Sequence, residues 1–238
     1  MNKEEFKNKV EELGIIITDE MLTKLNKYYE LLITWNKKFN LTRITEEKEV
    51  YLKHFYDSLS IKRAINLYNY NNLVDVGTGA GFPGIVLAII FKNLKIDLIE
   101  ANSKKCSFLT VVKETLSLDN IQIINERAEN YAKIAREKYE IATCRAVSHL
   151  NIISEIIIPM IKVSGYFLPL KGEIDKEIKE GLSILTKLNA KLVEVKTFKL
   201  PIENSNRSIL IIKKINTTNI IYPREYNKII KDLKNRQK

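Results

Sequence analysis

Apolar residues in the first part of the chain recur at helical spacing. After Thr18, whose side chain suits a helix N-cap, they fall every three or four positions, at Leu22, Leu25, Tyr29, Leu32 and Ile33. Three helices are expected here, over residues 3–13, 19–35 and 46–68, and the third could break near Asp57. The pattern therefore predicts an all-helical extension over residues 1–70 that packs on the remainder of the chain.

From residue 71 the pattern changes to short β-branched runs that alternate with amphipathic stretches, as in βαβ units. Seven strands are expected, over residues 73–76, 96–99, 121–124, 141–144, 165–170, 192–199 and 208–214. The last two follow each other with no helix between them, so they should form an antiparallel hairpin at one edge. We therefore predict an α/β fold with a mostly parallel, Rossmann-like sheet over residues 71–216, followed by a basic, weakly patterned tail over residues 217–238.

A glycine-rich segment directly follows the first expected strand. Asp75, Gly77, Gly79 and Gly81 form a DxGxGxG arrangement, which suits a nucleotide-type cofactor because glycine permits sharp turns and close approach of a ligand. The later glycines also fit GxGxxG, a weak signal for dinucleotides. The acidic residue two positions before the first glycine favours a ligand with a cationic amino-acid part over a pyrophosphate. A structural turn that binds no ligand is the alternative.

Charged residues follow the next two expected strands. Glu100 ends the second strand, about twenty residues beyond the loop, where a carboxylate would accept hydrogen bonds from both hydroxyls of a ribose. Arg127, Ala128 and Glu129 follow the third strand, in the position where such sheets hold an adenine. A solvated helix start is the alternative explanation for the two charged residues among them.

Composition narrows the class of protein. The 238 residues carry a formal charge of +10, which favours a polyanionic partner such as nucleic acid, although a biased genome would give the same charge. No apolar run reaches the roughly 18 residues of a membrane span, so a cytoplasmic protein with no membrane partner is expected. Cys106 and Cys144 lie far apart and outside any CxxC spacing, which predicts two reduced thiols and no metal. No obligate protein partner is indicated.

Several short motifs are spread over nearly the whole chain. They are WNKKFNLT at residues 35–42, HFYDSL at 54–59, DVGTGAGFPG at 75–84, RAE at 127–129, RAV at 145–147 and LKG at 170–172. Together they resemble the RsmG (GidB) family, the bacterial small-subunit ribosomal RNA guanine-N7 methyltransferases. The resemblance implies a class I S-adenosylmethionine-dependent methyltransferase that forms 7-methylguanine at guanine 527 of 16S ribosomal RNA. Its implied partner is that RNA or the small ribosomal subunit.

The resemblance also implies roles for individual residues. The cofactor site would be lined by Gly77, Phe82, Ala128, Glu129 and Arg145, beside Gly79, Gly81 and Glu100 from the loop and strand arguments. The candidate RNA-binding residues are Arg127, Arg145, Lys171 and Arg224. The tail departs from the family pattern, because Tyr222-Pro223-Arg224 is present without a Gly-Thr-Pro stretch after it.

Methylation at guanine N7 requires no general base, because N7 has an available lone pair and no proton to remove. No catalytic residue is therefore assigned, and His54 and Arg145 are the candidates. Cys144 would matter in a cytosine-C5 methyltransferase, where a cysteine attacks the base, but its Thr143-Cys144-Arg145 context lacks the usual proline. Two alternatives stay open: a small-molecule methyltransferase, and a non-catalytic RNA-binding factor in ribosome assembly.

Overall fold

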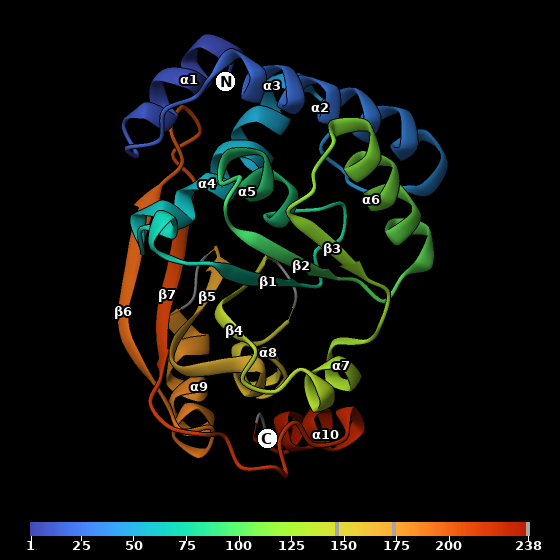
Figure 1. The fold of residues 1–238 in the computed structure, drawn as a ribbon. Helices are drawn as coiled ribbons and strands as arrows, with labels where there is room; N and C mark the ends of the chain where they lie inside the picture. The colour runs from blue at the N-terminus through green and yellow to red at the C-terminus, as the bar shows by residue number, and fades with distance from the viewer. Residues whose placement is uncertain (146–147, 173–174, 237–238) are drawn as a thin grey trace.

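The computed structural model describes residues 1–145, 148–172 and 175–236, which form a twisted sheet with helices on both faces (Figure 1). Seven strands lie in the order β3-β2-β1-β4-β5-β7-β6. Their bounds are β1 Asn72–Val76, β2 Lys95–Ile99, β3 Ile121–Ile124, β4 Tyr139–Arg145, β5 Ile161–Lys171, β6 Ala190–Lys199 and β7 Asn206–Lys214. Each strand predicted from the sequence is present, and the largest difference is at β5, which begins at Ile161 instead of residue 165.

Pairing direction divides the sheet into two parts. Strands β1 to β5 run parallel to one another, so their carboxyl ends meet at one edge. Strand β7 runs antiparallel to both β5 and β6, between which it lies. This confirms the predicted Rossmann-like sheet with an antiparallel C-terminal hairpin. In sheets of this kind, ligands bind outside the carboxyl ends of the parallel strands.

The two N-terminal helices begin and end at capping residues. Helix α1 (Lys3–Glu11) begins at a capping box formed by Asn2. Helix α2 (Asp19–Phe39) begins after the predicted cap Thr18 and ends where Asn40 adopts a left-handed conformation. It continues one turn beyond its expected end before this residue stops it.

The third helical segment is interrupted. It consists of α3 (Glu47–Val50), a π-helix η1 (Tyr51–Tyr56), α4 (Asp57–Leu59) and two 3-10 turns, η2 (Ser60–Arg63) and η3 (Leu67–Asn69). The expectation of one helix over residues 46–68 is corrected in this way: the α-helix ends at Val50, and the π-helix fills the six residues before Asp57, where the sequence allows a break. A π-turn accommodates an extra residue, which apolar spacing does not reveal, and such turns are frequent at functional sites.

Helices on the two faces of the sheet bury separate apolar clusters. The remaining helices before the tail are α5 (Gly84–Ile90), α6 (Ser103–Leu116), α7 (Ala128–Ile134), α8 (Leu150–Ile157), η4 (Ile158–Met160) and α9 (Asp175–Lys187). One cluster joins α1, α2, α5 and α6 to one face, and the other joins α7, α8 and α9 to the opposite face. The N-terminal helices thus share a core with the sheet. Among the described residues, no helix is long and apolar enough to cross a membrane.

The C-terminal tail contains a helix, α10 (Tyr226–Arg236), where the sequence indicated only a weak pattern. Arg136 holds the chain that leads to it by donating to three backbone carbonyls. Arg224 then bonds to the buried carboxylate of Glu155 on α8, and Ile229 of α10 is buried in the second apolar cluster. The helix has few apolar positions among its lysines and asparagines, so its periodicity is difficult to detect.

Candidate active site

The glycine loop connects β1 to α5 at the carboxyl edge of the sheet. Gly77, Gly79 and Gly81 all have positive φ, at 69°, 62° and 99°. Such angles favour glycine because a Cβ atom would crowd the backbone. The Gly77 N–H donates to the Ile99 carbonyl at 2.9 Å, which ties the loop to the end of β2.

Asp75 closes the turn of this loop. Its side chain is fully buried, and Oδ2 accepts hydrogen bonds from Thr78 Oγ1 at 2.6 Å and from the Gly84 N–H at 2.8 Å. Burial raises the pKa of Asp75 to about 6, and the two hydrogen bonds oppose that rise. Asp75 Oδ2 thus closes the loop, and a contact of this carboxylate with a ligand stays a prediction.

The glycines are required for different reasons. A Cβ atom on Gly79 would meet only the Gly77 carbonyl oxygen, at 4.0 Å, so the space beside this position is open. A Cβ atom on Gly81 would lie 2.5 Å from Ile85 and 2.7 Å from the hydroxyl of Tyr28 on α2. Gly81 is therefore required for packing against the N-terminal helices, whereas the backbone at Gly79 has open space beside it.

Glu100 lies directly after β2, against the glycine loop. One of its carboxylate oxygens accepts from the Gly79 N–H at 3.0 Å and the other from the Asn102 N–H at 2.8 Å. A carboxylate offers about four acceptor sites, so about two remain for other donors. The two neighbouring hydroxyls of a ribose would fit them.

The segment after β3 reaches the same edge. Arg127 Nε donates to Glu129 in an ion pair, and the Arg127 guanidinium lies 5.4 Å from the centre of the Tyr226 ring on α10. Both charged side chains are thus engaged within the protein. Ala128 is the first residue of α7, and the N–H groups of a first helical turn have no partner within the helix. Its backbone can donate to a ligand.

These residues fit S-adenosylmethionine. The loop at Gly77 and Gly79 permits close approach, Glu100 offers acceptors to a ribose, and Ala128 offers a backbone donor to an adenine. They lie at the ends of β1, β2 and β3, three adjacent parallel strands whose carboxyl ends are the ligand-binding edge of such a sheet.

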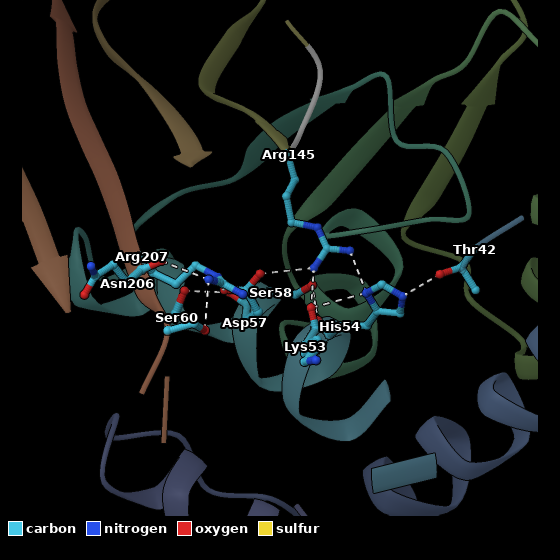
Figure 2. Close-up of polar contacts among 10 residues, drawn as sticks. Thr42, Lys53, His54, Asp57, Ser58, Ser60, Arg145, Asn206 and Arg207 are labelled. Atoms are coloured by element: carbon cyan, nitrogen blue, oxygen red, sulfur yellow. Dashed lines mark hydrogen bonds and ion pairs between the residues drawn. The ribbon is translucent and has the colours of Figure 1, made fainter. Parts of the chain in front are cut away.

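A second group of polar side chains lies where β4 ends (Figure 2). Arg145, the last residue of β4, donates from Nη2 to His54 Nδ1 at 3.0 Å and from Nη1 to the Lys53 carbonyl at 2.9 Å. Nη1 also lies 3.3 Å from Asp57 Oδ2. These partners come from η1 and the start of α4, so the N-terminal segment fixes the arginine at the end of a central strand.

His54 is held as a neutral imidazole. Burial, together with the charge of Arg145, lowers its pKa to about 3. Nδ1 lies 3.0 Å from Arg145 Nη2 and 3.2 Å from the Lys53 carbonyl. Because a guanidinium can only donate and makes the shorter contact, we assign Nδ1 as the acceptor, which leaves Nε2–H to donate to Thr42 Oγ1 at 2.9 Å. In this state His54 offers neither a base nor an acid at neutral pH. Its contacts give it the role of orienting Arg145.

Phe82 lies against this cluster and is almost fully buried. Its ring stacks on His54 at 4.3 Å between centroids and lies 5.0 Å from the Arg145 guanidinium. On another side it contacts the Tyr28 ring at 5.4 Å. Phe82 therefore links the glycine loop to the N-terminal helices, and a direct contact of its ring with the cofactor stays a prediction.

The sequence did not single out two members of the cluster, Asp57 and Arg207. Arg207 Nε lies 3.2 Å from Asp57 Oδ1, so this carboxylate bridges arginines from β4 and β7. Burial raises the pKa of Asp57, and the two arginines oppose the rise. Asp57 belongs to the HFYDSL motif and could have been found there. Arg207 lies 150 residues further along the chain and no pattern points to it.

A cavity of about 330 Å³ opens beside this cluster. Its polar lining includes Lys53, His54, Asp57, Ser60, Arg145, Lys171, Arg207 and Ser208. Four of these side chains are cationic and one is an acid, so the lining carries more positive than negative charge, although Lys53 is paired with Glu49 and Glu203. We call it the cationic cavity. It would attract a phosphate-bearing ligand such as a nucleotide.

Comparisons with known proteins point to one family. Residues 21–209 match a family model described as rRNA small subunit methyltransferase G. The ribosomal RNA small subunit methyltransferase G of Bacillus subtilis (strain 168) is 41% identical over 228 residues, which cover 94% of this chain and 95% of the relative. The chain belongs to the rRNA small subunit methyltransferase G family. The Listeria monocytogenes serotype 4b protein of the same name is 38% identical, covering 94% of this chain and 96% of its own length.

The fold agrees with membership of the methyltransferase G family. A SAM-dependent methyltransferase from Aquifex aeolicus superimposes with a TM-score of 0.54 at 15% sequence identity, covering 73% of this chain and 96% of that one. This family member therefore has the Rossmann-like fold of S-adenosylmethionine-dependent methyltransferases.

The two other candidate RNA-binding residues of this family member differ in their surroundings. Lys171, at the end of β5, lines the cationic cavity and donates to the Ser148 carbonyl. Arg224 bonds to Glu155 through Nε and Nη2, both at 2.8 Å. Its guanidinium is thus held within the protein, and a contact of Arg224 with RNA stays a prediction.

The cysteines lie away from the cationic cavity. Cys144 is buried in the second apolar cluster, and Cys106 is also buried; neither is part of a disulfide among the described residues. No group of His, Cys, Asp or Glu suited to a metal ion occurs among the described residues. Ala146 and Val147 of the RAV motif lie outside the described residues.

A larger cavity, of about 660 Å³, lies at the opposite edge of the sheet. Its lining includes Lys95 and Ile96 at the start of β2 and Ile121 at the start of β3. These positions are the amino ends of parallel strands, whereas ligands of this fold bind at the carboxyl ends. Size alone therefore does not identify the active site of this family member.

Proposed function

We propose that this chain transfers a methyl group from S-adenosylmethionine to N7 of guanine 527 in 16S ribosomal RNA, as free RNA or in the small ribosomal subunit. The observation that carries the proposal is the cationic cavity at Arg145, which Phe82 joins to the glycine loop. Backbone phosphates of RNA supply the negative charge that such a cavity attracts. Family membership supports the choice of RNA, and the motif resemblance supports the base and the atom.

The bound cofactor would supply an electrophilic methyl group. The protein then has to hold the base so that N7 faces this group, and orientation of this kind can lower a barrier by about 7–11 kcal/mol. N7 has a lone pair and no proton, so no general base is required. A neutral His54 suits this chemistry, because it removes no proton and keeps Arg145 in place.

We assign roles to the cofactor-binding residues on the same basis. Gly77 and Gly79 line the approach to the backbone, and Glu100 accepts from the ribose hydroxyls. The start of α7, at Ala128 and Glu129, addresses the adenine. Arg145 meets the carboxylate of the methionine part or an RNA phosphate, both of which suit a guanidinium.

The proposal divides the chain into three parts. Residues 71–216 form the methyltransferase unit, and residues 1–70 form an extension that supplies Lys53, His54 and Asp57 to the arginine cluster. Residues 217–238 form the tail. The enzyme would act in the cytoplasm, where it meets ribosomal RNA.

The test is transfer of labelled methyl groups from S-adenosylmethionine to unmodified small-subunit RNA and particles. Borohydride reduction and aniline cleavage then locate 7-methylguanine. We expect one cleavage, at guanine 527, and its loss in Gly77→Asp, because Gly77 has φ of 69° and a side chain there is strained. Circular dichroism and calorimetric titration with S-adenosylmethionine show whether the variant folds and whether it binds the cofactor.

Other outcomes would change the proposal in specific ways. Labelled RNA without cleavage would move the methyl group to another atom of the RNA. Cofactor binding without transfer to either substrate would leave a small-molecule methyltransferase as the next function to test. A chain that folds but binds no S-adenosylmethionine would favour a non-catalytic RNA-binding factor.

A further inference from the structure

The cationic cavity contains one buried carboxylate. Asp57 is 6% exposed, and its two oxygens lie 3.3 Å from Arg145 Nη1 and 3.2 Å from Arg207 Nε. Both distances are long for a charge-assisted hydrogen bond. Each oxygen uses one acceptor site on these contacts, and a carboxylate has about four. Asp57 lies between the two arginines (Figure 2) and lines the cavity, so its remaining acceptor sites can serve a ligand there.

Arg145 offers donors on the same wall of the cavity. It meets three acceptors among the described residues: the Lys53 carbonyl, Asp57 Oδ2 and His54 Nδ1. A guanidinium has more N–H groups than this, so donors remain. The cavity therefore presents an acceptor pair on Asp57 next to a donor on Arg145.

Guanine presents the complementary row of groups. The N2 amino group and N1–H are donors, O6 beside them is an acceptor, and N7 lies beyond O6. One carboxylate can accept from N2 and N1 together while a neighbouring arginine donates to O6. Adenine has an unprotonated N1 and an amino group in place of O6. Its lone pair would face the carboxylate, and its amino group would face the arginine.

We propose that Asp57 selects guanine by accepting hydrogen bonds from N1–H and the N2 amino group, while Arg145 donates to O6. This contact takes the place of the carboxylate or phosphate contact considered for Arg145 above. The inference rests on the proposed methylation of guanine. Held in this way, the base keeps N7 unbonded and available for reaction. At about 330 Å³ the cavity is at the small end of ligand pockets, which span about 300–1,000 Å³, and a single base extruded from RNA is a ligand of this small kind.

The neighbours of Asp57 fix this arrangement. Thr42 sets the tautomer of His54, which accepts from Arg145, and Arg207 holds the second oxygen of Asp57. The acceptor pair and the donor are therefore in place before a base enters. A site prepared in this way discriminates strongly, because a base that lacks a partner leaves a buried polar group unbonded.

The test changes the base and the carboxylate together. Two sets of small-subunit particles are prepared, one with guanosine at the target position and one with inosine, which lacks the N2 amino group. The rate of single-turnover methylation of each is measured with wild type and with Asp57→Asn. In wild type, inosine should react at least about tenfold more slowly than guanine. In Asp57→Asn this penalty should shrink by about tenfold. The different intrinsic reactivities of the two bases cancel, because they are the same for both proteins.

Each outcome has one meaning. An equal inosine penalty in both proteins would overturn the assignment and leave Asp57 as a bridge between arginines. No methylation of guanine by wild type would overturn the proposed function and this inference with it, and that result is seen before any variant is used. If Asp57→Asn does not fold, wild-type affinity decides: particles with inosine or 2-aminopurine should bind more weakly than those with guanine, and equal affinity overturns the assignment.

Asp97→Asn is the matched control. Asp97 on β2 is also a paired carboxylate, which accepts from Lys138 at 2.8 Å and from the Tyr139 hydroxyl at 2.6 Å, and it lines the other cavity. Its variant should keep the wild-type inosine penalty. If Asp97→Asn also lost the inosine penalty, replacing either carboxylate would abolish the preference for guanine. That result would overturn the assignment to Asp57.

Discussion

Asp75 is a buried carboxyl group in the turn that it closes, so the stability of the fold depends on whether it is ionised and therefore on pH. Its pKa is about 6 in the folded chain, against an ordinary value of 3.8, because burial disfavours the ionised form. The folded state therefore binds the proton more tightly than the unfolded state. The contribution of Asp75 to stability is fully present below about pH 4 and is lost as the pH rises through about 6.

Asp75→Asn should remove this dependence. The amide oxygen can accept from Thr78 and Gly84 as Oδ2 does, and no charge is buried. The free energy of unfolding of the variant, relative to wild type, should rise by about 3 kcal/mol between about pH 4 and pH 7, at about 1.4 kcal/mol per pKa unit. Urea unfolding at a series of pH values measures it. A difference that does not change with pH would mean that Asp75 ionises as an exposed carboxyl does.

His54 should stay neutral and in one tautomer between about pH 5 and pH 8. Its pKa of about 3 and the donation from Arg145 to Nδ1 leave the proton on Nε2. Nitrogen-15 NMR of labelled histidine should show an Nε2–H signal pattern that is constant over this range, with the exposed His149 as the reference signal. Thr42→Val removes the acceptor of that proton and should shift the His54 signals. A titrating His54 would contradict the contacts described for Arg145.

Sequence motifs named Arg145 and His54 as candidate site residues, but they did not reveal that the two side chains contact each other. The two residues are 91 positions apart, and their contact depends on the packing of η1 against the end of β4. Arg224 shows the opposite case. A basic residue after a Tyr-Pro pair has the same sequence signature whether it faces RNA or a buried Glu155.

At the scale of elements, Arg224 anchors the tail to α8. Glu155 is 1% exposed and accepts from the Arg224 backbone N–H, Nε and Nη2. Arg224→Ala removes the charged partner of this buried carboxylate and leaves it only the backbone N–H of residue 224. Such a loss costs 3–5 kcal/mol in fully buried pairs, so we expect about 3 kcal/mol for a partly exposed arginine.

Urea unfolding measures this loss. Lys133→Ala breaks the exposed ion pair with Glu225 and is the control, since exposed pairs contribute little. Similar losses in both variants would mean that Glu155 finds other partners when Arg224 is removed.

Regular elements were predictable and irregular ones were not. The strands follow from β-branched runs between turn residues, and α2 follows from Thr18 and the apolar spacing after it. The π-helix η1 shifts the spacing of apolar residues within a single segment, so the sequence predicted it as part of a longer helix. Helix α10 depends on contacts with α8, which propensity does not describe.

At the scale of the whole molecule, the charge of +10 makes RNA binding dependent on salt. The logarithm of the binding constant should fall linearly with the logarithm of salt concentration, by about 0.7–0.9 per phosphate contact. Lys171→Gln should reduce this slope by about one contact, because Lys171 lines the cationic cavity. Arg224→Gln should leave the slope unchanged, because its charge is matched by Glu155. Filter binding of small-subunit RNA measures both, and a reduced slope in Arg224→Gln would restore the predicted RNA contact.

The place of β7 in the sheet determines when the cationic cavity can exist. This strand lies between β5 and β6, and its Arg207 reaches back to Asp57 near the start of the chain. Proteins emerge from the ribosome N-terminus first, so η1 and β4, which line the cationic cavity, are synthesised long before β7, which completes its lining. If the proposed function holds, a nascent chain of this enzyme has no finished binding cavity, and it cannot capture the RNA of the ribosome that is synthesising it.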